Sequence, residues 1–313
     1  MPSKLSVNIG RLRIENPVMV CSGTFGYAEE FRGLTDIKKL GAIVTKTITL
    51  RARAGNPMPR TCETPAGMLN SIGLENPGID KFIKEKIPVL EKSGVPIIVS
   101  IASDQDIDEF PALAKKLNKI NAVGAIELNI SCPNVKHAHK VSGGGRLIAQ
   151  DAQATSDIVR SVRKATRKPL ITKLSPNVTD ITEIAMAAEE AGSDAVALVN
   201  TLIGMSIDVV ARRPKIAQGL AGLSGPAIRP VAVRMVWEVY QKIKIPIIGM
   251  GGIMDTESAL EFFIAGSSAI SVGTANFINP RAATEIISGI EKYLRSNKID
   301  SIKELTGSLK CRS

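Results

Sequence analysis

The stretch Ala125-Ile-Glu-Leu-Asn-Ile130, followed by Ser131-Cys-Pro-Asn134, determines the fold and the chemistry expected of this chain. Apolar and polar residues alternate between Gly124 and Pro133, a pattern typical of a buried strand that ends near Ser131. Pro133 disfavours helical backbone at the residue before it, so no helix is expected to start directly at the strand end. Cys132 thus stands just past a strand end, beside several amide and hydroxyl groups. A buried structural cysteine in a tight turn is the alternative, because free cysteine is among the most buried residue types.

Apolar runs of the same kind recur along the chain, and amphipathic helical patterns such as that of residues 151–165 separate most of them. Eight strand candidates cover residues 18–21, 42–47, 96–101, 125–130, 169–174, 195–200, 246–250 and 269–273. Eight alternating units predict an α/β fold, a (β/α)8 TIM barrel with catalytic groups at the carboxyl ends of its strands. A doubly wound sheet is the alternative, but no GxGxxG motif lies between an early strand and helix.

The remaining segments predict additions to one barrel domain spanning residues 1–313. Residues 5–7 and 12–14 predict a short hairpin at the barrel bottom. Three long connections, residues 51–78, 136–146 and 202–225, are expected to be irregular active-site loops. Gly143-Gly-Gly145 in the second of them suggests either a lid hinge or a plain flexible loop.

Composition excludes several classes of protein. Hydrophobic residues make up 44% of the 313 residues but aromatic residues only 4%, which suits helices packed on a parallel sheet. The four cysteines form no CxxC pair, so neither a disulfide framework nor a metal site is indicated. The sequence has no apolar signal segment or membrane span, so we expect a cytoplasmic protein. The formal net charge of +10 admits nucleic acid as a partner, but it can equally reflect a solvated surface or the attraction of an anionic cofactor or substrate.

Glycines after the last strands predict a phosphate site. Gly249-Met-Gly-Gly252 ends the seventh strand and Gly273-Thr274 ends the eighth, the positions where barrels bind phosphate. A helix beginning near Asp255 is expected to add its positive terminus. Glycines that merely ease tight turns are the alternative.

Two lysines predict anionic ligands. Lys46 and Lys173 lie in or at the end of strand patterns, where an unpaired ammonium would be costly. A flavin that becomes anionic on reduction, together with a carboxylate substrate, would supply two partners; a lysine at a surface-facing strand end is the alternative.

At this point several motifs together resemble one known family. They are Asn16-Pro-Val18, Ser22-Gly-Thr-Phe-Gly26, Thr45-Lys-Thr47, Met68-Leu-Asn-Ser-Ile-Gly-Leu74, Asn76-Pro-Gly78, Asn129-Ile-Ser-Cys-Pro-Asn-Val-Lys-His137, Lys173-Leu-Ser-Pro-Asn177, Val199-Asn-Thr201, Gly222-Leu-Ser-Gly-Pro226, Gly249-Met-Gly-Gly252 and Gly273-Thr-Ala-Asn276. In this order, over about residues 5–290, the chain resembles class 1B dihydroorotate dehydrogenases.

The resemblance implies FMN-dependent oxidation of (S)-dihydroorotate to orotate in pyrimidine (UMP) synthesis. It implies that Cys132 removes the C5 proton, while the C6 hydride passes to flavin N5. A thiol with an ordinary pKa near 8.5 is a usable base near neutral pH when its surroundings tune it. The substrate contacts it implies are Lys46, Asn70, Ser71, Ile72, Gly73, Leu74, Asn129, Asn134, Asn200 and Thr201. The FMN contacts it implies are Ser22, Lys46, Thr47, Ser100, Asn129, Lys173, Val199, Gly225, Gly251, Gly252, Gly273 and Thr274.

The resemblance also implies partners. Class 1B enzymes form homodimers and pass electrons to a second subunit that carries FAD and a [2Fe–2S] cluster and reduces NAD+, giving a heterotetramer. This chain has no four-cysteine cluster motif and no dinucleotide fingerprint of its own. It departs from the family at Ser100, often an asparagine, at Ala138-His-Lys140 in the lid, and at Ala221, usually a glycine.

Two other functions remain open from the sequence. One is a flavin barrel acting on another dihydropyrimidine, such as dihydrouridine in tRNA, which the basic charge would suit. The other is a barrel that binds a phosphometabolite without redox chemistry.

Overall fold

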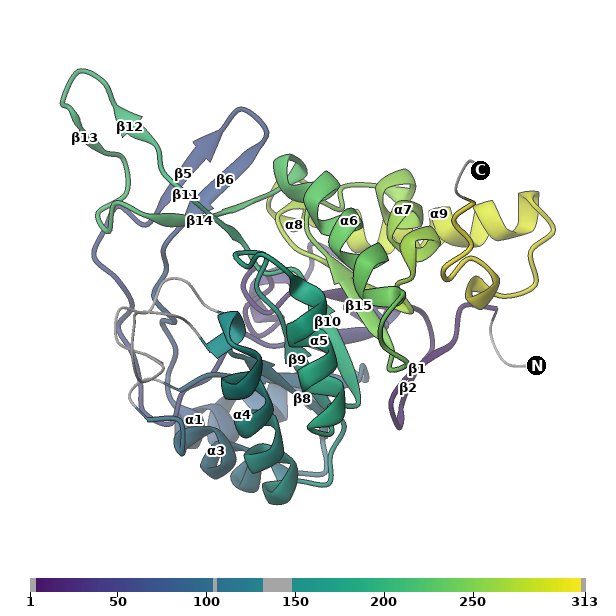
Figure 1. The fold of residues 1–313 in the computed structure, drawn as a ribbon, viewed down its shortest axis with the longest axis horizontal. Helices are drawn as coiled ribbons and strands as arrows, with labels where there is room; N and C mark the ends of the chain where they lie inside the picture. Colours follow the sequence, from purple (N-terminus) through teal and green to yellow (C-terminus); the bar gives the residue numbers. More distant parts are fainter. Residues whose placement is uncertain (1–3, 104–105, 132–147, 311–313) are drawn as a thin grey trace.

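A closed barrel of eight parallel strands forms the centre of the molecule (Figure 1). The computed structural model describes residues 4–103, 106–131 and 148–310. The barrel strands are β3 (Val18–Val20), β4 (Ala42–Val44), β7 (Ile97–Ile101), β8 (Val123–Asn129), β9 (Leu170–Lys173), β10 (Ala195–Leu198), β15 (Ile247–Met250) and β16 (Ala269–Val272). Each strand pairs with the next one along the chain, and β16 pairs with β3 to close the ring. All eight predicted strands are therefore confirmed.

Helices cover the outside of the barrel. They are α1 (Ile79–Lys81), α2 (Ile87–Glu91), α3 (Glu109–Asn118), α4 (Ala152–Ala165), α5 (Ile181–Glu190), α6 (Arg229–Tyr240), α7 (Thr256–Ala265), α8 (Ala275–Ile278) and α9 (Ala282–Ser296). The helix predicted over residues 151–165 is α4, and its buried side includes Ile158 and Val162. The strands are apolar on both faces because one face fills the barrel and the other meets these helices. Within the described ranges, no helix is long and apolar enough to cross a membrane.

The amino-terminal hairpin lies at the opposite end of the barrel from the site. Its strands are β1 (Val7–Ile9) and β2 (Leu12–Ile14). The first strand lies two residues later than predicted. The turn begins at Gly10, which has a φ of 56°, so the strand continues up to Ile9. The Arg11 side chain donates to the carbonyl of Arg167, which precedes β9. The hairpin therefore contacts the amino-terminal ends of the barrel strands, as predicted.

Two of the predicted irregular loops are instead a second sheet. Residues 51–78 contain β5 (Thr61–Thr64) and β6 (Gly67–Asn70), and residues 202–225 contain β11 (Leu202–Gly204) and β14 (Ala221–Ser224). They form an antiparallel sheet in the order β11-β14-β6-β5. A further hairpin of β12 (Ile207–Asp208) and β13 (Arg213–Pro214) extends away from the barrel (Figure 1). The prediction of structureless loops was wrong here, because the two segments complete each other's hydrogen bonds. The third predicted loop, residues 136–146, lies outside the described residues.

Candidate active site

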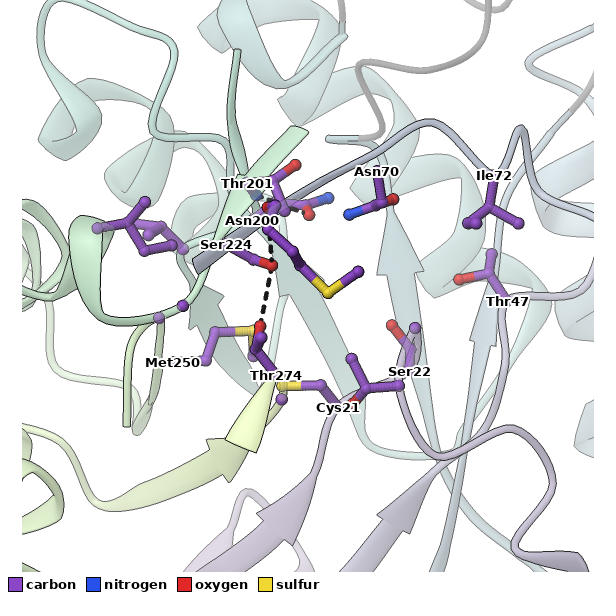
Figure 2. A pocket seen from close by; sticks show the side chains of 18 of the residues that line it. Cys21, Ser22, Thr47, Asn70, Ile72, Asn200, Thr201, Ser224, Met250 and Thr274 are labelled. Atoms are coloured by element: carbon purple, nitrogen blue, oxygen red, sulfur yellow. Dashed lines mark hydrogen bonds between the residues drawn. The ribbon is translucent and has the colours of Figure 1, made fainter. Parts of the chain in front are cut away.

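A cavity opens at the carboxyl ends of the barrel strands, where the second sheet adjoins the barrel. Its volume is about 1120 Å³, counting the space open to solvent at its mouth. Cys21 and Ser22 follow β3, Thr47 follows β4, and Met250 and Thr274 come from β15 and the turn after β16 (Figure 2). A concave site at this end of a parallel barrel is where such folds bind their ligands.

A chain of amide and hydroxyl groups crosses the floor of the cavity. The Asn129 side chain donates to the hydroxyl of Thr47 at 3.0 Å, and Thr47 is 3.0 Å from the hydroxyl of Ser100. On the other side, the Asn200 amide donates to the hydroxyl of Ser131 at 2.9 Å. These contacts join the ends of four barrel strands, so the amide groups are held before any ligand arrives.

The second sheet supplies one wall of the cavity. The Thr274 hydroxyl donates to the hydroxyl of Ser224 at 2.9 Å, which ties the end of β16 to β14 (Figure 2). Asn70, at the end of β6, donates to the carbonyl of Gly222 at 3.4 Å. In Figure 2 the Asn70 side chain lies beside that of Ile72, with Thr201 on the neighbouring wall. The 51–78 and 202–225 segments therefore build the site together.

Both lysines singled out in the sequence line the cavity. Lys46 is half-buried, whereas Lys173 is only 5% exposed. The Lys173 ammonium lies 3.4 Å from the hydroxyl of Ser22. Positive charge therefore faces the cavity from two sides, which favours an anionic ligand.

Glycines form the corner of the cavity next to Ser224 and Thr274, which are the sequence neighbours of Gly225 and Gly273. Gly251 and Gly252 have φ of 122° and 78°, and a Cβ on Gly252 would lie 2.8 Å from the carbonyl oxygen of Gly225. This close approach of two backbone turns is open only to glycine. The amino terminus of α7, however, does not contribute as predicted. The Asp255 carboxylate caps it by accepting the Ser258 N–H, and neither residue lines the cavity.

Most of the predicted site residues come together at this cavity. Those that line it are Ser22, Lys46, Thr47, Asn70, Ile72, Gly73, Leu74, Asn129, Lys173, Val199, Asn200, Thr201, Gly225, Gly251, Gly252, Gly273 and Thr274. Cys132 and Asn134 lie outside the described residues.

Two predicted contacts do not line the cavity. Ser71 is buried and accepts from the side chain of Asn56 at 2.9 Å, so it faces away while its neighbours Asn70 and Ile72 face in. Ser100 is fully buried behind Thr47, and its hydroxyl is used in that contact. Ser100 thus supports the lining residue Thr47, whereas Ser71 bonds Asn56, which does not line the cavity.

Several lining residues were missed in the sequence. They are Cys21, Gly23, Thr24, Thr61, Met68, Ser224, Ile228, Met250 and Phe277. Cys21 immediately precedes the Ser22-Gly-Thr motif, and that adjacency is the signal that could have found it. Its thiol donates to the carbonyl of Ser271 at 3.3 Å. Burial raises the pKa of the Cys21 thiol above its ordinary value, and the nearby Lys173 ammonium opposes that shift.

The donor set of the cavity suits a ligand with an anionic end and a flat polar face. Glycine backbone and hydroxyls meet at one corner, and amides and ammonium groups line the rest. No cluster of three or more histidine, cysteine or acidic side chains suitable for a metal occurs in the part of the chain that the structure describes. Fold and site thus define a (β/α)8 barrel with a cavity at its strand ends that favours an anionic ligand.

Comparison with known proteins identifies the family. The family model described as dihydroorotate dehydrogenase matches residues 4–294, and the chain belongs to this family. A protein of Geotalea uraniireducens named dihydroorotate dehydrogenase B (NAD(+)), catalytic subunit, is 52% identical over 305 residues, covering 97% of this chain and 98% of its own. Proteins of the same name from Geotalea daltonii and Geobacter sulfurreducens are 53% and 50% identical, and each match covers at least 97% of both chains.

Proposed function

We propose that this chain is a single domain that oxidises (S)-dihydroorotate to orotate with FMN as its cofactor. This oxidation is a step of pyrimidine synthesis. The observation that carries the proposal is the cavity itself, in which Asn70, Asn129 and Asn200 converge with Lys46 and Lys173. The amides can bond the alternating N–H and carbonyl groups of a pyrimidine ring, and an ammonium can bond its carboxylate. The relatives named as dihydroorotate dehydrogenase B catalytic subunits support the same substrate.

FMN is the proposed cofactor, and the cavity residues fit it. The glycine corner with Thr274 would hold the phosphate, since backbone N–H groups can approach an anion closely there. Ser22, Thr47, Asn129, Lys173 and Val199 would contact the ring system, and Lys173 would stabilise negative charge on it. Bound FMN would accept the hydride from substrate C6 at its N5.

The protein's own groups would bind, orient and deprotonate the substrate. Lys46, Asn70, Asn129, Asn200 and Thr201 are the proposed substrate contacts, with Ile72, Gly73 and Leu74 closing the space around it. Asn134 is a further proposed contact. Cys132 is the proposed base that removes the C5 proton, a role that its position after β8 supports.

The electrons are proposed to leave through another polypeptide. The relatives' names specify NAD(+) and a catalytic subunit, which supports a separate electron-transfer subunit. By resemblance to class 1B enzymes, that subunit would carry FAD and a [2Fe–2S] cluster and bind a homodimer of this chain, making a heterotetramer in the cytoplasm.

The purified chain tests this proposal through its colour and its substrate. We expect flavin absorbance, release of FMN on denaturation, and oxidation of free dihydroorotate with a soluble dye as acceptor. A colourless protein that binds no FMN would instead indicate a phosphometabolite-binding barrel. Oxidation or reduction confined to dihydrouridine in RNA, with free dihydroorotate inert, would replace the proposed substrate.

A further inference from the structure

Glu127 is a buried carboxylate in β8 to which the proposed mechanism gives no role. Glu127 is only 2% exposed to solvent. Its Oε1 atom has no hydrogen-bond partner among the residues that the structure describes. An ionised carboxylate removed from water without compensation is strongly unfavourable, so a compensating charge is expected nearby.

The strand register brings Glu127 close to Lys173. In the β8–β9 pair, Glu127 lies opposite Ile171, and Asn129 lies opposite Lys173. Side chains two residues apart point to the same face of a strand, so Glu127 shares the interior face of Asn129 and Lys173, both of which line the cavity. Lys173 is thus the diagonal neighbour of Glu127, one layer nearer the cavity.

Glu127 and Lys173 are the only charged side chains that are buried within residues 4–103, 106–131 and 148–310. They carry opposite signs. No second buried cation is therefore present in those ranges to balance Glu127, and no second buried anion to balance Lys173.

The other polar groups facing this region do not neutralise either charge. Ser100, on β7, is the register partner of Glu127 on its other side and is uncharged. Ser22 lies 3.4 Å from the Lys173 ammonium and is also uncharged. Lys46 lines the cavity but is only half-buried. Cys21 lies close enough for both charges to act on it, since Lys173 lowers and Glu127 raises the pKa of its thiol.

We propose that Glu127 is the buried counter-charge of Lys173, a positioning residue that holds the Lys173 side chain in place beneath the cofactor site. The two charges balance each other across β8 and β9 when no ligand is bound. Lys173 is then already in place when an anion forms in the cavity. The effect on the cofactor rests on the proposed function, whereas the pairing of the two side chains does not.

A double-mutant cycle on the FMN-free protein tests the pairing. Glu127→Gln and Lys173→Met each leave one buried charge unbalanced, so each should destabilise the folded state and raise the unfolding equilibrium constant. The double variant removes both charges. We expect its unfolding equilibrium constant to be smaller by about tenfold than the value obtained by multiplying the two single effects. Ile171→Val, at the position opposite Glu127, is the packing control and should show no coupling with Lys173→Met.

Additive effects in this cycle would overturn the pairing. If the single variants do not fold, the double variant decides the question, because a balanced pair predicts that removing both charges restores folding. A double variant that also fails to fold would contradict the proposal.

The midpoint potential of bound FMN tests the role of Glu127 toward the cofactor. We expect Glu127→Gln to lower the potential by about 30 mV or more, which corresponds to a tenfold change for two electrons. The reason is that Lys173, no longer held by its counter-charge, stabilises the reduced anion less. Glu127→Asp keeps a carboxylate and should recover part of the potential, and Ile171→Val should leave it unchanged. An unchanged or raised potential in Glu127→Gln would refute this role, while failure to bind FMN in the wild type would refute the proposed function instead.

Discussion

The side-chain amide of Asn129 donates a hydrogen bond to the hydroxyl of Thr47 across 3.0 Å, and so connects the end of β8 to the turn after β4. Thr47 is in turn 3.0 Å from Ser100 on β7, which lies between those two strands in the barrel. Asn129 is 7% exposed and nevertheless lines the cavity. One side chain therefore both holds the cavity floor together and presents a polar group to a ligand.

Asn129→Ala should weaken both stability and ligand binding. The variant removes the buried hydrogen bonds that Asn129 makes with the hydroxyls of Thr47 and Ser131, which lowers the free energy of unfolding by about 1–3 kcal/mol. Orotate affinity, measured by the change in the flavin spectrum, should fall by about tenfold or more because a ligand hydrogen bond is lost.

Asn118→Ala is the matched control for this change. The side-chain amide oxygen of Asn118 accepts hydrogen bonds from the Thr166 hydroxyl and from the backbone N–H of Arg167, at the end of the barrel opposite the cavity. It should reduce stability but leave orotate affinity unchanged. Equal orotate affinity in the Asn129 and Asn118 variants would mean that Asn129 does not contact the ligand.

The barrel was predictable from the sequence because its strands are short apolar runs buried on both faces. The second sheet was not, because its strands are partly exposed and pair over long distances. In β5, exposed and half-buried residues alternate. In the β14–β6 pair, Ser224 is the partner of Met68, which no local pattern reveals.

The site was predictable where the chain emerges from a barrel strand. Ser71 shows the limit of this approach, since neighbouring residues in a motif point to opposite sides and only Asn70 and Ile72 reach the cavity. Glu127 shows another limit. The sequence indicated that Lys173 needs an anionic partner, but Glu127, the buried acidic side chain among the described residues, became visible as a candidate only through the register of β8 and β9.

The glycine corner should not tolerate a side chain at Gly252. In Gly252→Ala the new Cβ would lie 2.7 Å from the Arg229 Cβ and 2.8 Å from the Gly225 oxygen, at a φ of 78°. The two turns must then separate, so we expect FMN affinity, measured by quenching of flavin fluorescence, to fall by at least about tenfold.

Gly33→Ala provides the comparison for this variant. Gly33 has a similar φ of 81°, but a Cβ there would meet nothing within 4 Å. It should carry the same backbone strain, about 1 kcal/mol or more, without any change in FMN affinity. If both alanine variants bind FMN as the wild type does, the phosphate is not held at this corner.

Tyr27 should make the protein lose stability in alkali. Burial raises the pKa of its hydroxyl above the ordinary value, and Glu30 and Glu75 raise it further. The folded state then holds the proton more tightly than the unfolded state, whose tyrosine has a pKa near 10. This contribution is fully present below about pH 10 and decreases as the pH rises beyond it.

Tyr27→Phe should remove this pH dependence. The Tyr27 hydroxyl is buried and has no hydrogen-bond partner among the described residues, so the variant should be about as stable as the wild type at pH 7. At pH 11 it should exceed the wild type by about 1 kcal/mol in urea unfolding, one pH unit above the unfolded pKa. If the free energies of unfolding of the two proteins changed in parallel between pH 7 and pH 11, Tyr27 would ionise as readily in the folded state as in the unfolded state.

Anaerobic mixing of the FMN-loaded chain with dihydroorotate, followed by the flavin absorbance, tests the central claim most directly. The wild type should bleach in a single turnover and release one orotate per flavin. Cys132→Ala should retain FMN and orotate binding but lose most of the bleaching rate at neutral pH, because no base removes the C5 proton. A flavin that stays oxidised in the wild type would contradict the proposed reaction, and bleaching of the variant at the wild-type rate would contradict the role of Cys132.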